Sequence, residues 1–125
     1  MGIQSDLMAT FDYEIVDEFL NHYSIMMDSL EILIIDLSKP EMYKRSLNEL
    51  FRIFHNIKSA SGFLKIEQMH RLSKFVEEVL EELRKINKTV NNDVITWFYN
   101  ISDMFNAWND DLENNNKLSH IKYTL

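Results

Sequence analysis

Apolar residues recur every three or four positions in four stretches of the chain, and short polar joints separate these stretches. Such spacing places the apolar side chains on one face of an α-helix, so each stretch predicts an amphipathic helix with a buried face. The first stretch spans 12–37, and Pro40 marks its end because the residue before a proline avoids the helical conformation. Its apolar stripe consists of Ile15, Val16, Phe19, Leu20, Tyr23, Met26, Met27, Leu30, Leu33, Ile34 and Leu37.

The other three predicted helices span 41–61, 66–86 and 93–113. Four amphipathic helices with short joints predict an all-α fold, an antiparallel up-down four-helix bundle over 12–113. We expect 1–11 to be a mobile leader, and the tail 114–125 to be either a short extra C-terminal helix or loose. The apolar stripe of the helix predicted over 41–61 is Leu47, Leu50, Phe51, Phe54 and Ile57. That of 66–86 is Met69, Leu72, Val76, Val79, Leu80, Leu83 and Ile86, and that of 93–113 is Val94, Phe98, Ile101, Phe105, Trp108 and Leu112.

Composition narrows the class of protein. A chain of 125 residues with 46% hydrophobic residues is long enough for one domain with one core. Two glycines and one proline are too few turn-formers for a many-stranded β fold. The absence of cysteine excludes disulfides and thiolate metal sites. No signal peptide or long apolar run is present, so we expect a cytoplasmic protein without a membrane partner.

Charge is unevenly distributed along the chain. The formal net charge is −7, which argues against general nucleic-acid binding. The segment 44–74 nevertheless carries seven basic and two acidic residues, a net charge of +5, and the remainder carries −12. Such a segment favours a phosphate group or an acidic partner surface. The alternative is an ordinary solvated helix face.

The basic segment contains a histidine that is suited to carry a phosphoryl group. His55 lies beside the apolar stripe of its helix, and helical spacing gives it the neighbours Asn48, Arg52, Lys58, Ser59 and Gly62. An imidazole with an ordinary pKa of about 6.5 is largely neutral near pH 7 and can act as a nucleophile. The alternative is a helix-edge histidine without a role.

The pattern His55-x-x-Lys58-Ser59, followed by Gly62 and by Glu77 on the next helix, resembles the histidine phosphotransfer (HPt) domain. The closest likeness is to the N-terminal phosphotransfer domain of chemotaxis histidine kinases, over about 12–112. The resemblance implies that His55 is phosphorylated, that the Glu77 carboxylate accepts the proton of its second ring nitrogen, and that Lys58 offsets phosphoryl charge. Ser59 departs from the common glycine at that position.

The resemblance also implies a docking surface around His55. Lys74 matches a position where the kinase domain carries a second histidine, so it is either a phosphate contact or an ion-pair partner of Glu77 or Glu78. Gly62 is either a helix C-cap or packing position, or a gap that exposes the imidazole. The expected docking residues are Arg52, Ser59, Gly62, Phe63, Lys65 and Lys74, together with Leu64.

The other ionisable residues show no second site. His22, His70 and His120 lack the flanking pattern and are expected at the surface, with His70 at the edge of the docking face. Glu77 is expected on the exposed face of its helix. No two histidines are spaced as i and i+4, so we expect no metal.

The resemblance implies a monomeric phosphocarrier that is not itself an enzyme and needs no cofactor. Its partners would be a histidine kinase and the receiver domain of a response regulator. Two alternatives stay open: a helical adaptor or inhibitor that binds such partners without being phosphorylated, and a phosphotransfer domain excised from a larger chemotaxis-type kinase.

Overall fold

The computed structural model of the chain describes residues 2–86 and 88–121, and over these ranges the fold is all-α. No strand occurs in the described ranges, which hold five helices. None of these helices combines the length and the apolar character that crossing a bilayer requires. The helices are α1 (Ile3–Thr10), α2 (Tyr13–Asp36), α3 (Tyr43–Phe63), α4 (Glu67–Arg84) and α5 (Asn92–Glu113).

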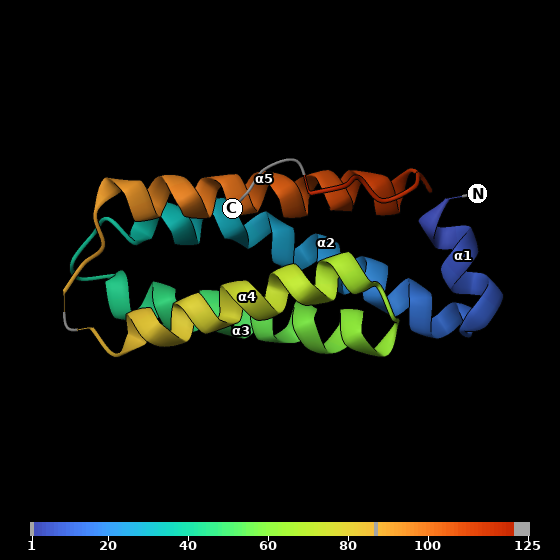
Figure 1. The fold of residues 1–125 in the computed structure, drawn as a ribbon, viewed down its shortest axis with the longest axis horizontal. Helices are drawn as coiled ribbons and strands as arrows, with labels where there is room; N and C mark the ends of the chain where they lie inside the picture. Colours follow the sequence, from blue (N-terminus) through green and yellow to red (C-terminus); the bar gives the residue numbers. More distant parts are fainter. Residues whose placement is uncertain (1, 87, 122–125) are drawn as a thin grey trace.

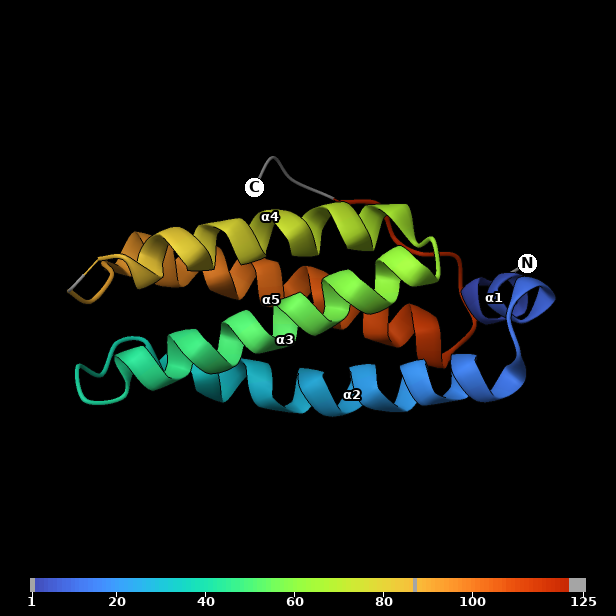
Figure 2. The ribbon, with the colours of Figure 1, turned by 90° about the horizontal axis from the view of Figure 1, so that it is seen from below.

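Helices α2 to α5 lie alongside one another in both views, and α1 sits at one end of them (Figures 1 and 2). The most extensive packing is between α3 and α4, followed by α2 against α5 and α2 against α3. The joint between α2 and α3 and the joint between α4 and α5 lie at the end opposite α1 (Figure 1). The tight turn between α3 and α4 lies at the same end as α1.

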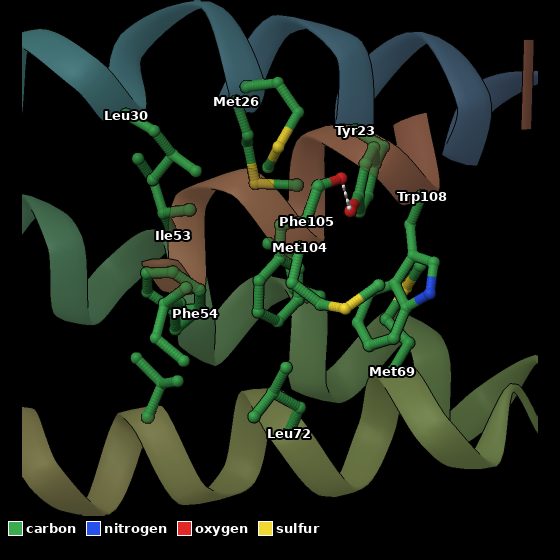
Figure 3. Close-up of a cluster of buried hydrophobic side chains, with 14 of the residues drawn as sticks. Tyr23, Met26, Leu30, Ile53, Phe54, Met69, Leu72, Met104, Phe105 and Trp108 are labelled. Atoms are coloured by element: carbon green, nitrogen blue, oxygen red, sulfur yellow. Dashed lines mark hydrogen bonds between the residues drawn. The ribbon is translucent and has the colours of Figure 1, made fainter. Parts of the chain in front are cut away.

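The core is built from the predicted stripes and is rich in aromatic rings (Figure 3). The ring of Phe105 packs edge-on against Phe54 and Trp108, with centroids 5.1 and 5.0 Å apart. Tyr23 lies fully buried beside them, and its hydroxyl donates a 2.7 Å hydrogen bond to the carbonyl of Phe105. This bond ties α2 to α5 inside the core.

The N-terminal segment, where the sequence predicted a mobile leader over 1–11, forms a helix over Ile3–Thr10. Leu7 is buried in the core. The Ile3 N–H donates to the carbonyl of Asn116, and the Gln4 amide donates to the carbonyl of Leu112. These contacts join the N-terminal helix to the end of α5 and the segment after it, and no local sequence pattern could predict them.

The C-terminal tail is held by side chains of α5. The indole N–H of Trp108 donates to the Ser119 carbonyl, and the backbone N–H and hydroxyl of Ser119 both donate to an Asp111 carboxylate oxygen, each at 2.8 Å. The described tail, 116–121, contains no helix. The expected extra C-terminal helix is therefore absent as far as residue 121, and 122–125 lie outside the described residues.

Candidate functional site

The turn between α3 and α4 decides which side chains meet. Helix α3 continues through Gly62 to Phe63, and Lys65 adopts the left-handed conformation with φ of 60°. The Ile66 N–H donates to the Ser61 carbonyl and the Lys65 N–H to the Gly62 carbonyl, which is the Schellman pattern of a helix C-terminus. The C-cap interpretation of Gly62 is therefore wrong, because Lys65 takes the position that usually favours glycine.

Gly62 is instead a point of close packing between α3 and α4. A methyl group at Gly62 would lie 3.0 Å from Nδ1 and Cε1 of His70. The ring is held there by a 2.9 Å hydrogen bond between His70 Nδ1 and the Lys58 carbonyl. His70 is half-buried, so it is less exposed than the surface position that the sequence predicted. The packing interpretation of Gly62 agrees with this geometry.

Three predicted residues come together across the α3–α4 interface. Nδ1 of His55 lies 2.8 Å from Oε2 of Glu77, and the Lys58 ammonium donates to Oε1 of the same carboxylate, also at 2.8 Å. His55 and Lys58 lie three residues apart on α3, and Glu77 faces both from α4. One carboxylate thus orients an imidazole with one oxygen and neutralises a lysine with the other.

The surroundings of Glu77 keep its carboxyl group ionised. Its side chain is only 15% exposed, so Glu77 is more buried than its predicted place on the exposed face of the helix. Burial by itself raises the pKa of Glu77, but hydrogen bonds and charge from Lys58 and His55 outweigh it and lower the pKa below 4.5. An ionised carboxylate only accepts hydrogen bonds, so a neutral His55 places its proton on Nδ1 and leaves a lone pair on Nε2.

The second ring nitrogen of His55 is available to a reactant. The side chain is 52% exposed, and no hydrogen-bond partner of Nε2 occurs among the described residues. The ring stacks nearly parallel on Phe51, with an angle of 13° and a centroid distance of 6.1 Å. Phe51 in turn lies under the Arg84 guanidinium, 4.5 Å from the ring centroid.

A hollow of about 320 Å³ opens beside His55 and presents cationic side chains. Its lining includes Arg52 from α3 and Arg84 from the last turn of α4. Sequence reasoning missed Arg84. The sequence spacing could have identified it, because Arg84 follows Glu77 by seven residues. Seven residues are about two helical turns and place both side chains on the same face of α4. Its lining among the described residues is Asn48, Phe51, Arg52, His55 and Arg84.

The expected docking residues differ in their placement. Phe63 is 61% exposed, with its ring 5.6 Å from that of Phe11, whereas Leu64 is only 4% exposed and offers no docking surface. Arg52 pairs with Glu49 at 3.5 Å and remains exposed. Ser59, Gly62, Lys65 and Lys74 are exposed, as are His22 and His120.

Lys74 does not form the ion pair that was one of its expected roles. Within the described ranges it has no carboxylate partner within 4.0 Å, and the Glu77 carboxylate is occupied by Lys58 and His55. The described part of the chain also holds no group of three or more residues placed to bind a metal ion. Lys74 therefore presents an unshared positive charge on α4 near this interface.

Comparisons with protein-family models, with curated proteins and with solved structures found no match for this chain.

Proposed function

We propose that this chain is a histidine phosphotransfer protein that carries a phosphoryl group on Nε2 of His55. The observation that supports this most is the shared Glu77 carboxylate, which bonds His55 Nδ1 and Lys58 at 2.8 Å each. It fixes the tautomer in which Nε2 has the lone pair. The proposal includes the arrangement of α2 to α5 as an antiparallel up-down four-helix bundle of the HPt kind.

The proposed transfer needs no group in this chain beyond those at the site. The Nε2 lone pair of His55 attacks the phosphorus of a donor, and an N–P bond forms as the donor P–O bond breaks. The electron pair of that bond leaves on the donor oxygen. The Nδ1 proton stays on the ring, and the Glu77 carboxylate balances the positive charge that the ring gains. Lys58 keeps Glu77 ionised through the cycle.

The donor and acceptor are proposed to be protein domains. The donor is a histidine kinase with bound ATP, or the phospho-aspartate of a receiver domain, and the acceptor is a receiver aspartate. The exposed ring of Phe63 and the positive side chains of Arg52, Lys65 and Lys74 lie on α3, on α4 and in the turn between them, and they suit an acidic partner surface with some apolar contact. The partner supplies Mg²⁺ and most of the transition-state stabilisation.

Phosphoryl uptake tests the proposal. The full chain is incubated with phosphorylated receiver domains or with a chemotaxis-type kinase core and ATP, and intact mass is read at neutral to alkaline pH. Wild type should gain one phosphoryl group and His55→Gln none, whereas His22→Gln, which changes an exposed histidine elsewhere, should behave as wild type. Uptake by His55→Gln, or partner binding without uptake by wild type, would instead favour an adaptor.

A further inference from the structure

A second, larger hollow lies at the end of the molecule where α2 meets α3 and α4 meets α5. Its volume is about 810 Å³, within the range of small-molecule sites. It shares Asn48 and Arg84 with the hollow beside His55, so the two adjoin along α3 and α4. Its described lining is Pro40, Tyr43, Lys44, Leu47, Asn48, Arg84, Ile86, Lys88 and Thr89.

The charges around this hollow have one sign. Lys44, Arg84 and Lys88 line it, and no acidic residue occurs among its described lining residues. Of the three, Arg84 pairs with Glu81 at 3.4 Å, and neither Lys44 nor Lys88 has a carboxylate within 4.0 Å in the described ranges. Three cations around one hollow, in a chain of net charge −7, favour an anion.

The floor of the hollow adds apolar surface and hydrogen-bonding groups. Tyr43 is 5% exposed, and its buried hydroxyl has no hydrogen-bond partner in the described part of the chain. Burial raises the pKa of Tyr43, so the hydroxyl keeps its proton and can still donate. Leu47 and Ile86 supply apolar contact, and Asn48 supplies an amide.

We propose that this hollow binds a phosphate monoester with an apolar body. The phosphate would be held by Lys44, Arg84 and Lys88, and the body would lie against Tyr43 and Leu47. Charge alone would suit any anion, but the apolar floor and the volume favour an organic ester over inorganic phosphate. This binding goes beyond the phosphocarrier proposal and does not require His55 to be phosphorylated.

The assignment is tested by titrating the full chain with phenyl phosphate and recording the shifts of the backbone amide signals by NMR. Inorganic phosphate and benzyl alcohol, each carrying one half of the recognition chemistry, serve as comparison ligands. Phenyl phosphate should shift residues around Tyr43 and Lys88 and bind roughly tenfold more tightly than either half. His55→Gln should bind it equally well, so failure of this proposal and failure of the phosphocarrier proposal remain distinguishable.

A charge-matched pair of variants gives the decisive comparison. Lys44→Ser/Lys88→Ser removes two exposed cations of the hollow and should weaken phenyl phosphate binding roughly tenfold. Arg71→Ser/Lys117→Ser removes two exposed cations elsewhere and should leave the affinity within about twofold. Equal weakening by both pairs, no shift around Tyr43, or equal affinity for inorganic phosphate would overturn the assignment.

Discussion

Replacing Gly62 by alanine tests the close packing of α3 on α4 that supports the site. Gly62 lies inside α3 with an ordinary φ, so alanine should gain helix propensity worth about 1 kcal/mol. The added methyl would lie 3.0 Å from two ring atoms of His70, however, and the ring must move away. That movement weakens the bond to the Lys58 carbonyl, at a cost of about 1 kcal/mol. We therefore expect Gly62→Ala to leave the unfolding free energy nearly unchanged.

A double-mutant cycle separates the two contributions. In a His70→Ala background no ring stands in the way, and Gly62→Ala should raise the unfolding free energy by about 1 kcal/mol. The coupling between positions 62 and 70 is then about 1 kcal/mol. Urea unfolding followed by circular dichroism and by the fluorescence of Trp97 and Trp108 measures all four proteins. A full gain from Gly62→Ala in both backgrounds would refute the packing argument.

Further predictions concern the site and the core. The lowered pKa of Glu77 means that its carboxylate stabilises the folded state above its ordinary value of 4.5, and that this stability is lost as pH falls through the folded-state pKa. The unfolding free energy of Glu77→Gln should therefore depend less on pH below 4.5 than that of wild type. An unchanged pH dependence would contradict a lowered pKa of Glu77 in the folded state. Lys58→Met should raise the pKa of Glu77, as read by NMR titration of its carboxyl carbon. Tyr23→Phe, which removes the buried bond to Phe105, should lower the unfolding free energy by about 1 kcal/mol, whereas the exposed Tyr13→Phe should not.

The sequence predicted the helices well because their periodicity is local. Phe98, Phe105 and Trp108 repeat at helical spacing along α5, and all three are fully buried. The ends of the pattern were less reliable. Ile15 and Ile86 fit the stripes but are exposed, because Ile15 lies in the first turn of α2 and Ile86 lies beyond the end of α4.

The site was predicted in part for the same reason. The i, i+3 relation of His55 and Lys58 is visible in one helix, but Glu77 was found through resemblance, since its approach depends on the turn at Lys65. The roles of Arg84 and His70 also depend on how α4 returns along α3. Helix α1 was missed because Leu7 is its single buried residue and because its hydrogen bonds to Leu112, Asn115 and Asn116 reach residues more than 100 positions away.

Identifying which histidine nitrogen carries the phosphoryl group tests the central claim most directly. Protein labelled with ¹⁵N in its histidine rings is phosphorylated by an active partner, and the N–P coupling and ring shifts of His55 are read by NMR at alkaline pH. Because Glu77 holds Nδ1, the account predicts phosphorylation on Nε2 of His55 and on no other histidine. Phosphorylation on Nδ1, or on another histidine, would contradict it.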